Sequence, residues 1–224
     1  MKKQLFGLSL LVVVCFCLTD AGFAKHKKSS SSPNTASKAN FDYYLMTLSW
    51  APEFCTVTPK AKSSDECNPK KQMGLVVHGL WPQYDSGKWP ESCANTPQVP
   101  SDLVDRMLPI MPGEPLIQHE WAKHGTCSGL SMQDYFGAIE KFYNGLRLPP
   151  DFKKPTEAAQ TSPGAIAGKF ATANDAPKAA FRVSCPKNEF SAVQVCLGKD
   201  MKYIACPDTV KTCRASRIEV APVP

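Results

Sequence analysis

The sequence lacks several features that would assign it to common classes of protein. It contains no Cys-x-x-Cys pair and no internal repeat, and histidine is scarce, with four residues in 224. Its longest apolar run, Leu5 to Leu18, is shorter than the roughly 20 residues that are needed to cross a bilayer. These absences argue against a zinc site built from thiolates, against several domains and against a membrane anchor.

The N-terminus has the pattern of a secretory signal peptide. Lys2 and Lys3 precede the apolar run, and small residues at Gly22 and Ala24 follow it. We therefore expect residues 1–24 to be removed and the protein to be secreted, either to a periplasm or to the extracellular space. Residues 25–40 are rich in lysine and serine, so we expect a disordered leader, followed by a single domain over residues 41–224.

Cysteine is plentiful in the expected mature chain. Ten cysteines are present, and Cys15 and Cys17 fall in the signal peptide. The other eight are Cys55, Cys67, Cys93, Cys127, Cys185, Cys196, Cys206 and Cys213. An even set in an exported chain indicates disulfides, although eight cysteines allow 105 pairings.

Hydrophobic periodicity predicts an α+β fold. Apolar residues alternate over 44–50 and form a short run at 74–77, and both patterns predict strands. Apolar and aromatic residues at helical spacing predict a helix over 135–146, with Ser131 as its N-cap.

Two further alternating segments near the C-terminus predict a hairpin. Residues 193–197 alternate up to a turn at 198–200, and residues 201–205 alternate away from it. Cys196 and Cys206 flank this turn at nearly symmetric distances, which suggests a disulfide across the hairpin.

Three of the four histidines lie in two short segments that could carry chemistry. His78 follows the predicted strand at 74–77, and the strand's end is a usual place for active-site residues. A predicted helix, which Pro115 can open and Gly125 can close, carries His119, Glu120, Lys123 and His124 on one face. Such a face can be a solvated polar surface. However, Cys127 can tie the end of this helix to another segment, which favours a functional cluster.

A zinc site built from the three histidines is the first alternative. The metalloprotease pattern His-Glu-x-x-His places its histidines four residues apart, whereas His119 and His124 are five apart. Lys123 occupies the ligand position, and an ammonium beside a divalent cation is unfavourable. The same ammonium favours an anionic phosphodiester, so we expect no metal and no cofactor.

The two segments together resemble the signature segments of the ribonuclease T2 family. They are His78-Gly79-Leu80-Trp81-Pro82 and His119-Glu120-Trp121-Ala122-Lys123-His124-Gly125-Thr126-Cys127. The likeness extends to the cysteine pattern and covers most of residues 41–218. It implies an α+β fold with a central antiparallel sheet flanked by helices, which agrees with the periodicity.

The resemblance also implies a role for each residue of the two segments. His124 corresponds to the general base, His78 to the general acid and His119 to the residue that grips the substrate phosphate. Glu120 and Lys123 correspond to residues that stabilise five-coordinate phosphorus. Trp81 resembles an aromatic residue of the base-binding pocket, although plain core packing explains a tryptophan equally well.

The implied activity is a metal-independent endoribonuclease, which we expect to act as a monomer on single-stranded RNA. The 2′-hydroxyl of the substrate would attack phosphorus to give a 2′,3′-cyclic phosphate and then a 3′-phosphate. The implied disulfides are Cys55–Cys67, Cys93–Cys127, Cys185–Cys213 and Cys196–Cys206. The formal net charge of +6 is compatible with a polyanionic ligand.

Two departures from the family pattern leave base preference open. Gln83 stands where many relatives carry an acidic residue or its amide, and Leu116 and Ile117 replace an aromatic pair. Besides the zinc-dependent hydrolase, a catalytically inactive relative that acts as a binding protein remains as an alternative function. RNA cleavage assayed with and without a chelator separates the three.

Overall fold

A four-stranded antiparallel sheet forms the centre of the protein. The computed structural model describes residues 40–58 and 64–224, so the expected signal peptide and nearly all of the expected leader lie outside the described residues. The strands of the sheet, in their spatial order, are β2 (Leu75–Gln83), β1 (Tyr43–Trp50), β5 (Ala192–Leu197) and β4 (Phe181–Ser184). Two short strands, β3 (Ala159–Thr161) and β6 (Ile218–Val220), form a separate antiparallel pair.

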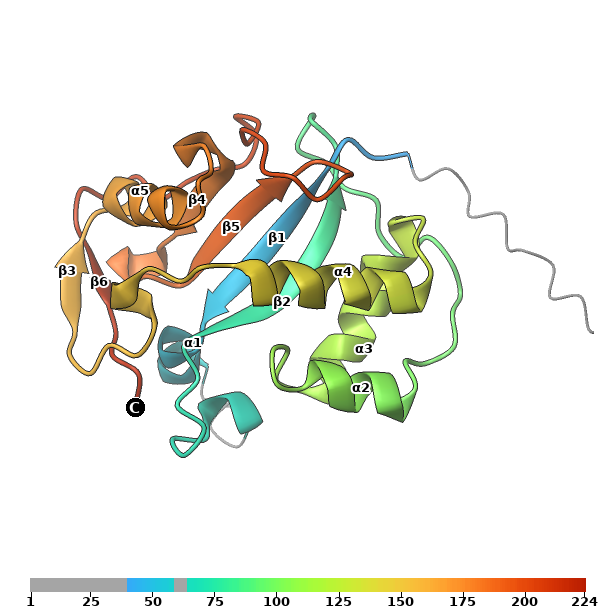
Figure 1. Ribbon diagram of the computed structural model, residues 1–224, viewed down its shortest axis with the longest axis horizontal. Coiled ribbons are helices and arrows are strands. Elements are labelled where there is room, and N and C mark those ends of the chain that lie inside the picture. The colour runs from blue at the N-terminus through green and yellow to red at the C-terminus, as the bar shows by residue number, and fades with distance from the viewer. Residues whose placement is uncertain (1–39, 59–63) are drawn as a thin grey trace, which may run out of the picture. The chain divides into compact units, whose positions relative to one another are not determined.

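Helices surround this sheet, which confirms the predicted α+β class. The α-helices are α1 (Ala51–Val57), α2 (Ser101–Met107), α3 (Glu114–Lys123), α4 (Met132–Gly145) and α5 (Pro163–Ala173). Among the described residues, five single turns of 3-10 helix lie at Asp65–Cys67, Gly125–Cys127, Pro150–Phe152, Lys178–Ala180 and Pro186–Asn188. In Figure 1, α4 crosses the sheet, α2 and α3 lie on the β2 side, and α5 lies on the β4 side. Within the described residues, none of the helices has both the length and the apolar character required to cross a membrane.

Alternation along β1 divides the sheet into two faces. Tyr44, Met46, Leu48 and Trp50 are buried in the main hydrophobic core, as the predicted alternation requires. The residues between them point the other way, and Tyr43 and Leu45 belong to a second, much smaller cluster. The sheet therefore buries one face under helices and leaves most of the other face for polar side chains.

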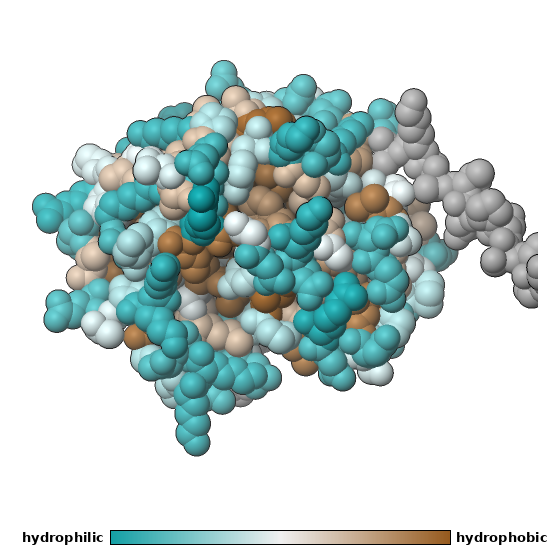
Figure 2. Space-filling model, viewed as in Figure 1, coloured by the Kyte–Doolittle hydropathy of each residue, from teal (hydrophilic) through white to brown (hydrophobic). Residues whose placement is uncertain are grey.

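The exterior on the face seen in Figure 2 is largely hydrophilic, with hydrophobic residues between the polar ones near its middle. Large apolar side chains are mostly buried, and among the described residues the exposed ones are Val57, Trp89 and Leu130. Of these, Trp89 is half exposed, at 50%. An exposed tryptophan invites the question of what it contacts, and its position is described below.

The predicted helix over 135–146 is confirmed, and α4 extends it at its N-terminal end. Ser131 is the N-cap, and its hydroxyl accepts a hydrogen bond from the Asp134 amide at 3.1 Å. Tyr135, Phe136 and Ile139 form the buried side of the helix. The Tyr135 hydroxyl donates to the Leu80 carbonyl at 2.9 Å, which ties α4 to β2.

The prediction that the second strand ends at Val77 is wrong. β2 continues to Gln83, because it pairs with β1 from Leu75 opposite Trp50 to Gln83 opposite Tyr43. The register shifts between Thr47 and Leu48, so the strand contains a bulge beside His78. Pro82 is tolerated because β2 is an edge strand and needs no second set of ladder hydrogen bonds.

The predicted C-terminal hairpin is only half present. Residues 193–197 belong to β5, but residues 201–205 form no strand and contribute one bridge, between Leu197 and Tyr203. The reason is that β4 pairs with β5 along the same edge and β1 occupies the other edge. Both segments have the alternating pattern of a strand, but only residues 193–197 pair along their length within the sheet.

Four disulfides cross-link the described part of the chain. They join Cys55 to Cys67, Cys93 to Cys127, Cys185 to Cys213 and Cys196 to Cys206, the pairs that the family resemblance implied. The Cys93–Cys127 bridge ties the segment before α2 to the turn that follows α3. A hydrogen bond from the Ser92 amide to the Lys123 carbonyl, at 2.8 Å, reinforces the same junction.

We predict that losing the Cys93–Cys127 bridge destabilises the fold more than losing Cys55–Cys67. The first closes a loop with a sequence separation of 34 and the second one of 12. The chain-entropy model then gives losses of about 4 and about 3 kcal/mol. Urea unfolding of the two double cysteine-to-serine variants measures the difference. A larger loss for the shorter loop, or two or more free thiols in wild-type protein lacking residues 1–24, would contradict this account.

Candidate active site

A cleft of about 510 Å³ opens beside β2 and the C-terminal end of α3. All six residues singled out from the two sequence segments line it, and the structure brings them together from positions up to 46 residues apart. The lining residues are Tyr43, Leu45, His78, Trp81, Gln83, Gly87, Trp89, His119, Glu120, Lys123, His124, Gln194, Thr209, Val210 and Lys211. Three of the six expected residues are histidines and one is lysine, so the cleft is suited to an anion.

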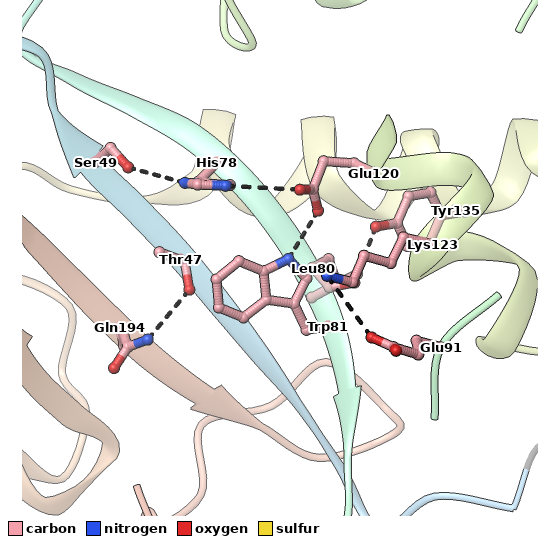
Figure 3. Close-up of polar contacts among 10 residues, drawn as sticks. All are labelled: Thr47, Ser49, His78, Leu80, Trp81, Glu91, Glu120, Lys123, Tyr135 and Gln194. Atoms are coloured by element: carbon pink, nitrogen blue, oxygen red, sulfur yellow. Dashed lines mark hydrogen bonds and ion pairs between the residues drawn. The ribbon is translucent and has the colours of Figure 1, made fainter. Parts of the chain in front are cut away.

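The bulge in β2 places His78 between two polar partners. Its Nδ1 atom lies 3.4 Å from the Ser49 hydroxyl of β1, and its Nε2 atom lies 3.7 Å from Oε1 of Glu120. Figure 3 shows His78 between these two side chains. Burial lowers the pKa of His78 below its ordinary value, and the positive charge of His119 lowers it further. The imidazole therefore loses its proton more readily than a histidine in water.

Glu120 is the buried centre of the site, with 1% of its surface exposed. Its Oε2 atom accepts a hydrogen bond of 2.7 Å from the Trp81 indole nitrogen, and Figure 3 shows the carboxylate reaching both Trp81 and His78. Burial raises its pKa to about 7, although the Trp81 hydrogen bond and Lys123 both lower it. Desolvation therefore outweighs the partners, and Glu120 holds a proton in mildly acidic solution.

His124 lies where α3 ends. Its backbone amide closes the last turn by donating to the Glu120 carbonyl at 3.0 Å, and its ring is buried. Burial, followed by the charge of Lys123, lowers its pKa to about 4. Its Nδ1 atom is buried and has no hydrogen-bond partner among the described residues. Nε2 is therefore the nitrogen available for proton exchange with a molecule in the cleft.

Two cationic or potentially cationic side chains complete the α3 face of the cleft. His119 is exposed, and Lys123 is partly exposed with its ammonium 3.6 Å from a carboxylate oxygen of Glu91. An ion pair at this distance and exposure is weak, so an anionic ligand can compete with Glu91 for Lys123. The helix face that was predicted to carry the four polar side chains thus lines the cleft and does not point only into bulk solvent.

Trp81 is partly buried and lines the cleft, so plain core packing does not describe it, and its place in a base-binding pocket stays a prediction. Its ring lies 5.4 Å from the rings of both His78 and His124. Its indole nitrogen is committed to Glu120. The Trp81 side chain therefore lies next to both imidazole rings and orients the Glu120 carboxylate. One surface of the Trp81 ring still lines the cleft.

Several cleft residues were not found from the sequence. Trp89 contributes an exposed indole, with its nitrogen 3.2 Å from a carboxylate oxygen of Glu91. Gln83, whose position the family resemblance had linked to base preference, is buried at the cleft wall. Thr209 and Lys211 come from the C-terminal loop, more than 80 residues after α3. Trp89 stands in an irregular segment without periodicity, so the only signal in the sequence was an aromatic residue among polar ones.

Metal binding was the main competing interpretation of the histidines. In the part of the chain that the structure describes, no three histidine, cysteine, aspartate or glutamate side chains are grouped as metal ligands. The ammonium of Lys123 lies in the same cleft as the three histidines. An assay in the presence of a chelator, described below, tests this interpretation directly.

Comparison with protein families identifies the relationship. The model of the Ribonuclease T2 family matches residues 41–206, a span that contains every residue of the cleft described above except Thr209, Val210 and Lys211. The chain belongs to the ribonuclease T2 family. The expectation drawn from the two signature segments is thus confirmed.

Similar proteins support this membership. The chain is 39% identical over 124 residues to a probable ribonuclease of Haemophilus influenzae and 43% identical over 107 residues to a ribonuclease of Aeromonas hydrophila. These matches cover 50% and 48% of this chain and 46% and 47% of the relatives. The chain therefore matches these curated T2-family relatives over about half of their length.

Solved structures support the fold. An RNase-related protein from Calystegia sepium superposes with a TM-score of 0.64 at 25% identity, covering 81% of this chain and 97% of that one. Ribonuclease NT in complex with 5′-AMP gives a TM-score of 0.57, also at 25% identity, with 82% and 99% covered. The S-like ribonuclease trichomaglin gives 0.67 at 19% identity, with 82% and 99% covered, and at that identity it supports the fold alone.

We predict that Gly79→Ala disrupts this T2-family site by overpacking. A Cβ atom at position 79 would overlap the Glu120 carboxylate and lie 2.5 Å from the Trp81 indole nitrogen. Overpacking of this kind costs about 1–3 kcal/mol of unfolding free energy. Gly137→Ala is the matched control, because its Cβ in α4 would meet nothing within 4 Å. The control should gain about 0.5–1 kcal/mol. Urea unfolding measures both, and equal stabilities would contradict the close approach.

Proposed function

We propose that this T2-family chain is a metal-independent endoribonuclease that cleaves single-stranded RNA by transphosphorylation. The observation that carries the proposal is that His78 and His124 line one cleft, each with its ring 5.4 Å from the ring of Trp81. The reaction needs one group to remove a proton and a second group to supply one, and two imidazoles meet this need without a metal.

In the first step, His124 takes the proton from the 2′-hydroxyl of the substrate. The 2′-oxygen attacks the neighbouring phosphorus, the bond from phosphorus to the 5′-oxygen breaks, and His78 gives its proton to the departing 5′-oxygen. The products are a 2′,3′-cyclic phosphate and a 5′-hydroxyl. In the second step the roles reverse: His78 takes a proton from water, the water oxygen attacks phosphorus, the bond from phosphorus to the 2′-oxygen breaks, and His124 returns its proton to that oxygen. A 3′-phosphate is left.

The neighbouring side chains act on the phosphoryl oxygens. Lys123 and a protonated His119 supply positive charge at the mouth of the cleft, where an anionic substrate enters. Glu120 would repel a phosphate if it were ionised. Because burial raises its pKa to about 7, it is mostly protonated in mildly acidic solution and can donate a hydrogen bond to the five-coordinate phosphorane.

The cleft also offers surfaces for a base. Trp89 and the free surface of Trp81 can stack on a nucleobase, and the Gln83 amide can hydrogen-bond to its edge. An amide both donates and accepts, so Gln83 alone selects no single base. Ribonuclease NT was solved with 5′-AMP, which supports a nucleotide as the ligand of this fold.

The proposal includes the setting of the enzyme. We take residues 1–24 as a signal peptide, residues 25–40 as a leader and residues 41–224 as the catalytic domain, acting as a monomer outside the cytosol. Four disulfides support an oxidising compartment, because such bridges are rare where thiols are kept reduced. An inactive binding protein is the weaker alternative, since it gives no reason for burying Glu120 beside His78 and Trp81.

We predict a bell-shaped pH dependence of kcat/KM with an acidic optimum. As base, His124 must be neutral, so activity rises with pH through its pKa of about 4. As acid, His78 must be protonated, and its lowered pKa makes activity fall as pH rises towards and beyond about 6.5. Lys123 lowers the pKa of His124 and Glu91 raises it. Lys123→Gln should therefore move the acid limb to higher pH, and Glu91→Gln should move it to lower pH. Shifts in the same direction would contradict the assignment.

The roles of the two histidines are tested by changing the leaving group. With a dinucleotide, His78→Ala and His124→Ala should each lose about 10² to 10⁴-fold in rate, the usual contribution of proton transfer. A uridine 3′-phosphate ester of nitrophenol needs no proton on departure. It should therefore rescue His78→Ala far more than His124→Ala. His26→Ala, in the expected leader, controls for loss of a histidine.

All of these assays are run in excess chelator, and a 2′-deoxy substrate is included. Wild-type protein should keep its activity in the chelator and leave the 2′-deoxy substrate intact. Activity that disappears in the chelator and returns with zinc would favour the zinc-dependent hydrolase. Equal rescue of the two alanine variants would reverse the proposal that His78 is the acid, and cleavage of the 2′-deoxy substrate would exclude the cyclic phosphate.

A further inference from the structure

A second depression of about 460 Å³ adjoins the cleft, and we call it the Arg214 depression. Its lining residues are Val183, Ser184, Cys185, Asn188, Gln194, Lys211, Thr212, Cys213, Arg214 and Ala215. Gln194 and Lys211 line both hollows. The two hollows therefore adjoin at these side chains, and a chain molecule that extends from the cleft over these two residues reaches the Arg214 depression.

Polar side chains cross the sheet between the two hollows. Thr47 of β1 is paired with Gln194 of β5, which in turn is paired with Arg182 of β4. The Gln194 amide donates to the Thr47 hydroxyl at 3.5 Å, and Figure 3 shows this pair beside Trp81 and His78. An antiparallel sheet commonly leaves one face to solvent, so this polar strip is open to water or to a polar ligand.

The charge of the Arg214 depression is positive. Lys211 and Arg214 are both exposed and no carboxylate lines the hollow. Neither cation takes part in an ion pair among the described residues. The Lys211 ammonium donates to the backbone carbonyl of Asp208 at 2.9 Å, which holds it at the border with the cleft. Both cations are thus available to an anion.

The walls of the Arg214 depression are held in place. The Cys185–Cys213 disulfide joins the segment that carries Asn188 to the segment that carries Arg214. Within the first segment, Lys187 and Asn188 have φ values of 54° and 65°, a conformation that costs free energy for residues other than glycine. This strained turn lies at the hollow and places the Asn188 side chain in its lining.

We infer that the Arg214 depression is a phosphate-binding subsite for an RNA nucleotide beyond the scissile linkage. The inference rests on the proposed function, because it concerns the path of the same strand outside the catalytic cleft. Arginine forms paired hydrogen bonds with phosphate oxygens, and the amides of Asn188 and Gln194 can donate to the same backbone. The subsite contacts the RNA backbone and therefore does not select a base sequence. It favours longer chains over dinucleotides because it binds a nucleotide beyond the scissile linkage.

The test compares substrates that have one cleavable linkage. Oligodeoxynucleotides with a single ribonucleotide are extended on its 5′ side or on its 3′ side, and a dinucleotide is the reference. Arg214→Ala should lower kcat/KM about fivefold at 0.1 M salt for one of the two extended substrates, the counterion-release contribution of one phosphate contact. Its effect on the dinucleotide should be much smaller. Arg214→Lys should keep part of the advantage.

Arg217→Ala is the matched control. Arg217 is an exposed arginine three positions away, it hydrogen-bonds Gln160 at 3.3 Å, and it does not line the Arg214 depression. Removing it changes the net charge by the same amount and should affect all substrates equally. If Arg214→Ala matches Arg217→Ala on every substrate, or lowers dinucleotide cleavage as much as cleavage of the extended substrates, the subsite is refuted.

Binding of a fully 2′-deoxy oligonucleotide separates failure of the subsite from failure of the enzyme activity. This probe lacks the attacking hydroxyl, so its affinity is independent of catalysis. Arg214→Ala should reduce the slope of log affinity against log salt by about 0.7, and Arg217→Ala should not. A wild-type protein that shows this binding and cleaves no RNA would refute the proposed function and keep the subsite. If wild-type protein cleaves RNA but Arg214→Ala binds the probe with the same salt slope as wild type, the subsite alone is refuted.

Discussion

A single hydrogen bond, from the Trp81 indole nitrogen to the Glu120 carboxylate, joins the edge strand β2 to helix α3. The two signature segments come from these two elements, and they meet at the Glu120 carboxylate, which His78 also approaches at 3.7 Å. Its geometry requires Gly79, because any side chain there would occupy the space of the carboxylate. Gly125 has a similar part just after the C-terminal end of α3, where a Cβ atom would overlap the Trp121 ring.

Burying the Glu120 carboxylate is unfavourable, and the consequence is a raised pKa that lets this residue hold a proton in the site. A carboxylate with 1% of its surface exposed and one strong hydrogen bond is incompletely compensated, so its pKa rises to about 7. The same desolvation lowers the pKa values of His78 and His124. One physical effect thus makes the acid group easier to protonate and the imidazoles easier to deprotonate. The result is a set of groups that exchange protons near neutral or mildly acidic pH.

Much of the site could be predicted because its signals are local. His78, His119, Glu120, Lys123 and His124 lie in two short segments, and helical spacing alone places four of them on one face. The alternation of β1 likewise follows from a period of two, and the structure buries its apolar residues in the main core. These signals come from residues that are close together in the sequence, so they are present whatever tertiary contacts the chain makes.

The sequence by itself determined the α+β class, the Ser131 cap and the identity of six residues that line the cleft. Tertiary structure alone decided that β2 runs on to Gln83, that residues 201–205 stay outside the sheet, and that Trp81 orients Glu120. It also brought Trp89 and Lys211 into the cleft. The physical reason is that strand register, bulges and free sheet edges are set by competition between segments far apart in the chain, and periodicity within one segment carries no record of its competitors.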